Sequence, residues 1–150
     1  MNQNILTYLN QIEGYKTAIK SLHWDAKNMS EHKLWDDIAD SVAEIQDNVS
    51  EMAQGIDKQI PLNTLAPTHY HVSSKEQILK DILADTKTLH KALGESEEYI
   101  GIRSELESFI GEINKYNYLL KIAIKENKIK QVVNETINRY INTNLLRCKN

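Results

Sequence analysis

The sequence predicts an all-α protein, an up-down four-helix bundle with an additional helical segment at its C-terminus. Apolar residues recur at spacings of three and four along most of the 150 residues, which is the period of an amphipathic helix. Five glycines and two prolines leave long stretches free to be helical. The chain length suits a single core, so we expect the bundle over residues 1–127 and the extra helical segment over residues 128–150.

The first helix is expected over residues 3–27 and the second from Ser30 to about Ile56. Gly14 interrupts the apolar stripe of the first helix, and Ser30 is a favourable N-cap residue for the second. Only a short connection is left between them, which favours antiparallel neighbours.

Residues 57–73 form the longest irregular stretch and contain both prolines. The third helix is expected to start at Ser73 or Ser74, because Ser73-x-x-Glu76 has the form of a capping box. Gly94 should end it. A fourth helix starting near Ser96 and a separate fifth amphipathic segment are expected to complete the chain.

The second helix has two distinct faces. One carries a narrow apolar stripe that predicts the bundle core, formed by Ile38, Val42, Ile45, Val49 and Ile56. At about 100° per residue, a second arc lies nearly opposite and holds four side chains that can bind a metal: His32, Asp36, Asp47 and Glu51. Ala39, Ala43 and Ser50 lie close beside them.

These four residues form two pairs that cannot share an ion within one helix. His32 and Asp36 are neighbours at i, i+4, as are Asp47 and Glu51, but the pairs lie roughly 16 Å apart along the axis. The midpoint of residues 36 and 47 is 41.5, and the midpoint of residues 32 and 51 is the same, so the two pairs are placed symmetrically about a point between residues 41 and 42. A second copy of the helix, antiparallel across a two-fold axis at that point, sets each pair against the other. Such a dimer would hold two identical sites.

Three short patterns resemble the ferroxidase motif of the Dps-like mini-ferritins, the family of the DNA-binding protein from starved cells. They are His23-Trp24, His32-x3-Asp36 and Asp47-x3-Glu51. Pro61-Leu62-Asn63-Thr64-Leu65 is also similar to a segment that follows the second helix in that family. The gap between His23 and His32 is shorter than the family's usual one.

The resemblance implies a ferritin-like bundle with a crossover between helices two and three, assembled as a homo-oligomer into a hollow dodecamer. It implies that His23, His32 and Asp36 form one half of an iron site, while Asp47 and Glu51 complete the site of the partner subunit. The implied activity is ferroxidase: Fe(II) is oxidised, preferably by hydrogen peroxide, and Fe(III) is stored. Mixed imidazole and carboxylate ligands suit iron, with manganese and zinc as competitors. Trp24 and Trp35 are either redox-active neighbours of this site or packing residues.

The charge distribution bears on possible partners. Residues 1–114 hold 10 basic and 19 acidic residues, whereas residues 115–150 hold 8 basic and 2 acidic ones. A basic C-terminal segment can contact nucleic acid or form a solvated helix face. Since no basic residue precedes Lys16, the sequence predicts weak DNA binding at most. The shortened gap between His23 and His32 and the basic C-terminal segment motivate an alternative function, a structural or nucleic-acid-binding ferritin-like protein with little ferroxidase activity.

Other features predict the cellular setting. The single cysteine, Cys148, allows no disulfide within one chain, no apolar run approaches the length of a membrane span, and the N-terminus has no secretory signal. These observations predict a cytoplasmic protein without a membrane partner. Phosphate-binding glycine loops and nucleophile elbows are absent from the sequence.

Overall fold

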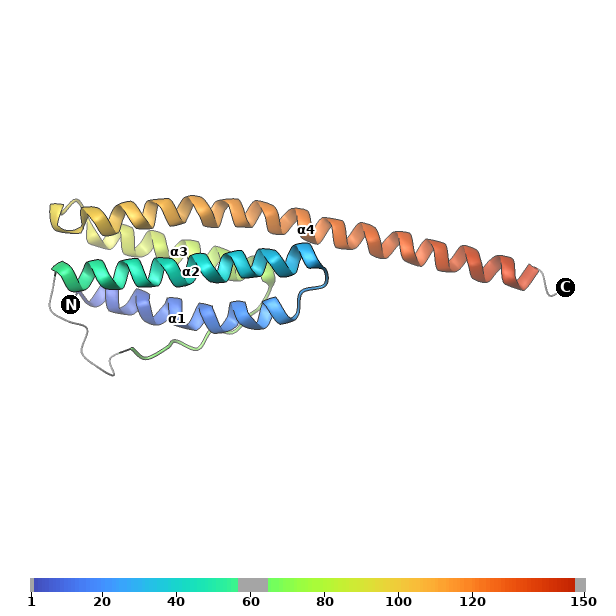
Figure 1. Cartoon of the computed structure of the whole chain (residues 1–150), viewed down its shortest axis with the longest axis horizontal. Helices are drawn as coiled ribbons and strands as arrows, with labels where there is room; N and C mark the ends of the chain where they lie inside the picture. The colour runs from blue at the N-terminus through green and yellow to red at the C-terminus, as the bar shows by residue number, and fades with distance from the viewer. Residues whose placement is uncertain (1, 57–64, 148–150) are drawn as a thin grey trace.

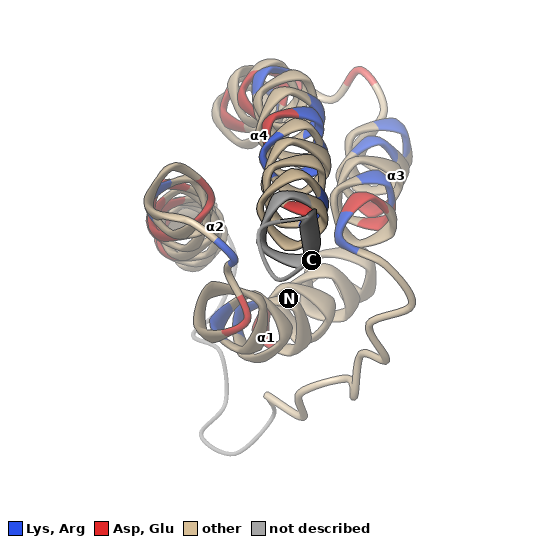
Figure 2. Ribbon diagram, turned by 90° about the vertical axis from the view of Figure 1, so that its right-hand side faces the viewer, with Lys and Arg blue, Asp and Glu red and all other residues tan. Residues whose placement is uncertain are grey.

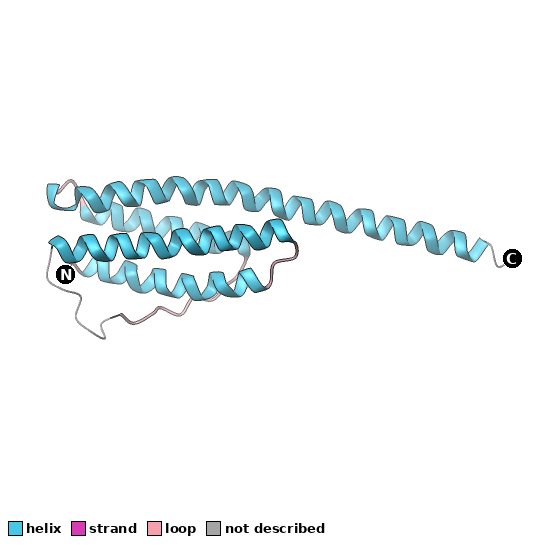
Figure 3. Cartoon of the chain, viewed as in Figure 1, coloured by secondary structure: helices cyan, strands magenta, loops and turns pink. Residues whose placement is uncertain are grey.

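The computed structural model describes residues 2–56 and 65–147, and all regular structure in these ranges is helical (Figure 3). The elements in chain order are α1 (Gln3–Trp24), α2 (Met29–Ile56), α3 (Lys75–Leu93), the short 3₁₀ helix η1 (Glu97–Tyr99) and α4 (Ile100–Arg147). The predicted all-α bundle of four helices is confirmed for this part of the chain.

The four long helices form a bundle in which every pair of neighbours is antiparallel. α1 packs against α2 and α3, and α4 packs against the same two helices. In Figure 1, α1 and α4 run in one direction and α2 and α3 in the other. Opposed helix dipoles therefore lie side by side at every contact, which is the favourable arrangement.

The connection between α2 and α3 has to run the length of the bundle, because these two helices point the same way (Figure 1). Its described part, residues 65–74, lies along α1. The Thr68 N–H donates to the Asn10 carbonyl at 3.0 Å, and the Ala66 N–H donates to Asn10 Oδ1 at 2.9 Å. Most of the proline-containing motif, Pro61-Leu62-Asn63-Thr64, lies outside the described residues.

Gly14 belongs to this contact and does not interrupt α1, contrary to the expectation from sequence. The helix continues through it, and a Cβ atom at this position would collide with the backbone carbonyl oxygen of Thr68. The glycine therefore allows the connection to pass close to the helix.

The first two helix boundaries differ from the predicted ones. α1 ends at Trp24 and not at residue 27: the Ala26 N–H bonds to the His23 carbonyl, three residues back, as the chain turns. Asn28 caps α2 in place of Ser30, because Asn28 Oδ1 accepts the Glu31 N–H at 2.8 Å. An asparagine side chain fits this role as well as serine does.

The third helix is capped by Ser74, whose hydroxyl accepts the Gln77 N–H at 3.0 Å. The capping box predicted at Ser73 is not formed, because the helix begins one residue later than that motif requires. Gly94 ends α3 as predicted, with a positive φ of 61°, a conformation that suits glycine.

The core occupies the centre of the bundle and includes the predicted apolar face of α2. Ile38, Val42, Ile45 and Val49 are buried there, and Ile56 is partly buried. Trp35 is fully buried among them. The opposite face of α2 consequently points away from the core.

The C-terminal segment continues α4 without a break, so it is not a separate helix. No glycine or proline occurs between Gly111 and Arg147, and α4 extends over 48 residues. Its last part projects beyond the end of the bundle (Figure 1). We call residues 128–147 the arm. The side chains described for it, up to residue 143, are all exposed.

Candidate metal centre

Three of the five predicted ligands lie together on the outer surface of α1 and α2. His23 comes from the last turn of α1, and His32 and Asp36 come from the first turns of α2. His23 Nε2 lies 3.2 Å from His32 Nδ1 and 3.1 Å from Asp36 Oδ1. His32 Nδ1 lies 3.5 Å from Asp36 Oδ2. One ligand atom from each residue falls within 4.8 Å of the others.

The local fold explains this convergence. His32 and Asp36 are one helical turn apart and share a face. The chain reverses between Trp24 and Met29, which returns the end of α1 to the start of α2 and sets His23 beside them. The shorter gap between the two histidines is therefore compatible with a shared site.

The separations match those of ligands on a common ion. Metal–ligand bonds of about 2.1 Å place adjacent ligand atoms roughly 3.0 Å apart at right angles and 3.4 Å apart at tetrahedral angles. The observed distances of 3.1, 3.2 and 3.5 Å lie close to this range, with Asp36 presenting Oδ1 to His23 and Oδ2 to His32. The side chains are 24%, 45% and 54% exposed for His23, His32 and Asp36, so further positions around an ion would remain open.

Asp47 and Glu51 do not join this cluster within one chain. Both are exposed on α2, further along the helix from His32 and Asp36. Among the described residues, the His23, His32 and Asp36 group is the one place where three potential ligands come together. One subunit by itself therefore supplies three of the five predicted ligands.

A hollow of about 430 Å³ adjoins the cluster between the outer faces of α1 and α2. Its polar wall includes Glu13 and Lys16, which contact the nearly buried Gln46. Gln46 Nε2 donates to Glu13 Oε2 at 2.9 Å, and Lys16 Nζ donates to Glu13 at 3.1 Å and to Gln46 Oε1 at 2.8 Å. The Gln46 hydrogen bond, followed by Lys16, holds the pKa of Glu13 below its ordinary value despite partial burial. The positive charge of Lys16, which lies beside the cluster, is thus paired with the Glu13 carboxylate.

The two tryptophans differ in position. Trp35 is fully buried in the core, whereas Trp24 is 70% exposed, with Lys20 Nζ 5.4 Å from the centre of its ring. Of the remaining histidines, His69 and His71 are exposed on the α2–α3 connection, and His90 pairs with Glu107 at 2.8 Å.

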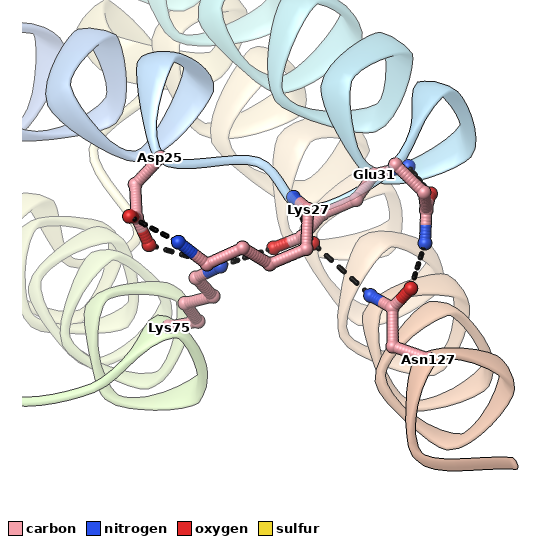
Figure 4. A network of polar contacts seen from close by, with 6 residues as sticks. Asp25, Lys27, Glu31, Lys75 and Asn127 are labelled. Atoms are coloured by element: carbon pink, nitrogen blue, oxygen red, sulfur yellow. Dashed lines mark hydrogen bonds and ion pairs between the residues drawn. The ribbon is translucent and has the colours of Figure 1, made fainter. Parts of the chain in front are cut away.

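Sequence reasoning missed a buried carboxylate near the cluster. Glu31 is 1% exposed and forms an ion pair with Lys75 at 2.5 Å. It also accepts hydrogen bonds from the Lys27 backbone N–H and from Asn127 Nδ2. Figure 4 shows how this network joins the α1–α2 turn, α3 and α4. Burial would raise the pKa of Glu31, but Lys75 and the backbone N–H outweigh it and lower this pKa. The spacing Asn28-x-x-Glu31, typical of a helix N-terminus, was the available signal.

A second polar group lies between α1, α3 and the connection. Tyr15 Oη donates to Asp85 Oδ2 at 2.6 Å, Tyr70 Oη donates to Asp81 Oδ2 at 2.5 Å, and the two tyrosine rings are 4.8 Å apart. Burial, and then the acceptor carboxylate, raise the pKa of both tyrosines. Burial also raises the pKa of Asp85. Its position on the apolar stripe of the third helix was the sequence signal that could have revealed it.

The protein is thus a four-helix bundle with a histidine and aspartate cluster on its outer surface. No protein-family model, curated protein or solved structure matches the chain. In the part of the chain that the structure describes, no helix combines the length and hydropathy needed to cross a bilayer.

Proposed function

We propose that this protein is a Dps-like ferroxidase that oxidises Fe(II) at sites shared between two subunits and stores Fe(III) in an oligomeric cage. The observation that carries the proposal is the convergence of His23, His32 and Asp36 at ligand-like separations. These residues come from two helices, so their spacing in sequence alone does not produce the cluster. The cluster coincides with the half-site that the family resemblance implies.

The second half of each site would come from the partner subunit. Asp47 and Glu51 are exposed and lie on the same outward face of α2 as the cluster. A two-fold axis between residues 41 and 42 brings them to His32 and Asp36 of the partner. Ala39 and Ala43 beside this axis permit close approach of the two helices.

The bundle topology also supports the proposal. Antiparallel neighbours with a full-length connection between α2 and α3 (Figure 1) are the arrangement expected of a ferritin-like protein. In the proposed assembly, two-fold dimers combine further into a dodecameric cage. The cage provides an enclosed volume for the ferric product.

The ligand set suits the proposed reaction. Neutral imidazoles bind Fe(II) through nitrogen. Carboxylates offer hard oxygen ligands, and their negative charge compensates the positive charge of the Fe(III) product. Two ferrous ions each give one electron to hydrogen peroxide, its O–O bond breaks, and the two oxygens leave as water after taking up protons. In this proposal a carboxylate such as Asp36 or Glu51 would bridge two ions and so hold both electron donors at one oxidant molecule.

An iron-oxidation assay on metal-free protein tests this function. Fe(II) and hydrogen peroxide are added, and the ferric product is followed by absorbance. We expect His23→Ala to slow oxidation by about tenfold or more, with His90→Ala, whose ring lies between α3 and α4, as the matched control. Calorimetry with Fe(II) under argon should show loss of binding in the same variant. Oxidation by the wild type no faster than in buffer would contradict the proposal and favour the structural or nucleic-acid-binding alternative.

A further inference from the structure

The arm exposes a continuous apolar stripe to solvent. Ile129, Val132, Val133, Ile137 and Ile141 are between 48% and 61% exposed. At about 100° per residue they fall within one half of the helix circumference. The other half carries polar side chains, namely Gln131, Asn134, Glu135, Asn138 and Asn142. Such a pattern is typical of a helix that packs against another surface.

The charges bordering the stripe indicate what kind of surface this is. Lys128 and Arg139 lie along one edge and Lys130 along the other, while Glu135 lies on the polar half. Two arms packed against each other would bring cations against cations, which disfavours pairing of arms. The complementary surface should be apolar along its centre and acidic at its edges.

The groove between α2 and α4 is apolar along its centre and mostly acidic at its edges. Where the arm leaves the bundle, a hollow of about 310 Å³ is lined by apolar side chains that include Leu34, Leu119 and Ile122, and its charged margin consists of Asp37, Glu126 and one lysine, Lys33. Ile122 is 38% exposed and lies on the same side of α4 as the apolar stripe of the arm.

A second, acidic hollow lies further along the same two helices, beyond Tyr116, whose hydroxyl bridges α4 to Ser41 and Asp37 of α2. Glu44, Glu105 and Glu112 surround this second space, which has Phe109 at its wall. Among the described residues, none of these three carboxylates forms an ion pair. Figure 2, viewed along the arm, shows both basic and acidic positions along α4 and mostly acidic positions on α2.

We propose that the arm of one copy lies along the α2–α4 groove of a second copy, and that the arm of the second copy lies along the same groove of the first. The arm is about 30 Å long and a helix is about 10 Å wide, so two arms in two grooves would bury roughly 1,200 Å² in total, which reaches the range of specific interfaces. The groove and the metal-site face are different faces of α2. This contact therefore does not rest on the proposed ferroxidase function.

A charge exchange tests the contact. One variant, Lys130→Glu with Arg139→Glu, carries an acidic arm, and the other, Glu44→Lys with Glu112→Lys, carries a basic groove. We expect light scattering to show that each variant alone has a lower mass than the wild type. In an equal mixture each arm meets a groove of opposite charge, so the mass should return to the wild-type value.

A second pair of variants separates apolar packing from charge. Val133→Ser with Ile137→Ser should weaken association by about tenfold or more. Asn134→Ser with Asn138→Ser, which changes the polar half of the arm equally, should leave the mass unchanged. Circular dichroism should show that all variants stay helical.

Several results would overturn the proposal. They are a wild-type mass that no arm variant changes, a charge-exchange mixture that recovers no mass, and association that the serine pair on the polar half weakens equally. Arm-dependent sedimentation of single chains with anionic phospholipid vesicles, or an arm-dependent shift of duplex DNA, would identify a different occupant.

Discussion

His23 Nε2 lies 3.1 Å from Asp36 Oδ1, although the two side chains belong to different helices. His32 contacts both. The three residues form a cluster within one chain, whereas Asp47 and Glu51 remain apart from it. This division predicts which variants should complement one another.

We predict that two inactive variants regain activity when mixed. Asp47→Asn with Glu51→Gln removes the acidic half, and His32→Ala with Asp36→Asn removes part of the cluster. Each variant should lose most of its iron oxidation because every site lacks ligands. In a mixed dimer one of the two sites has all its ligands, so activity should partly return after subunit exchange.

Oxidation rates measured before and after exchange check this prediction. Asp40→Asn, which removes another exposed carboxylate of α2, is the control and should keep its activity. If mixed dimers form and stay inactive, the two halves do not share a site.

The Glu31–Lys75 pair should be a major source of stability. Lys75→Met leaves the nearly buried Glu31 carboxylate without its ammonium partner. We expect a loss of about 2–3 kcal/mol in the free energy of unfolding, less than for a fully buried ion pair because Lys75 is 20% exposed. Lys80→Met, an exposed change on the same helix, should cost little. Urea unfolding at pH 7 measures both, and equal effects would contradict a special role for the pair.

The same pair predicts a pH dependence. The pKa of Glu31 is lower in the folded state than its ordinary value of 4.5. Its stabilisation is therefore fully present above pH 4.5 and is lost as the pH falls through the folded pKa. In Glu31→Gln this loss should be absent, so the difference in stability between wild type and variant should narrow below pH 4.5.

Asp85 should show the opposite pH dependence. Burial raises its pKa above the ordinary 3.8, so its favourable contribution is present below pH 3.8 and is lost as the pH rises through the folded pKa. Asp85→Asn keeps an acceptor for Tyr15 Oη without ionising. We expect it to be neutral near pH 3.5 and to stabilise the protein by up to about 1 kcal/mol at pH 7. A stability difference that does not change with pH would refute this.

Gly14→Ala should disturb the connection between α2 and α3. The added Cβ meets the backbone carbonyl of Thr68, which cannot move without breaking the bonds to Asn10. We expect a loss of about 1–3 kcal/mol, measured by thermal unfolding, and faster proteolysis of the connection. Gly55→Ala, where nothing lies within 4 Å, should stabilise α2 slightly. Equal stability of the two variants would show that the connection is not held at this point.

DNA binding should be weak near physiological salt. The arm supplies Lys128, Lys130 and Arg139, but the rest of the chain is acidic and repels phosphate. A gel-shift titration should show little binding at about 150 mM salt and a steep salt dependence for any binding at lower salt. A chain ending at Asn127 is the control. Tight binding at physiological salt that this truncation abolishes would contradict the prediction.

The sequence by itself determined the helical class, the core face of α2 and the outward face with His32, Asp36, Asp47 and Glu51. These features follow from a period of 3.6 residues, which is local and readable from spacing. The sequence also determined the end of α3, since glycine readily adopts the positive φ with which a helix often ends. Boundaries that depend on a choice between two capping residues, Asn28 or Ser30 and Ser74 or Ser73, could not be settled locally.

Only the tertiary structure decided which distant residues meet. His23 reaches His32 and Asp36 because the turn returns α1 to α2, and Glu31 is buried because α3 and α4 bring Lys75 and Asn127 to it. The sequence predicts that Gly14 interrupts a helix, whereas the structure shows that the α2–α3 connection passes directly over it. Such contacts depend on how the helices pack in three dimensions, which the periodicity of any one helix does not contain.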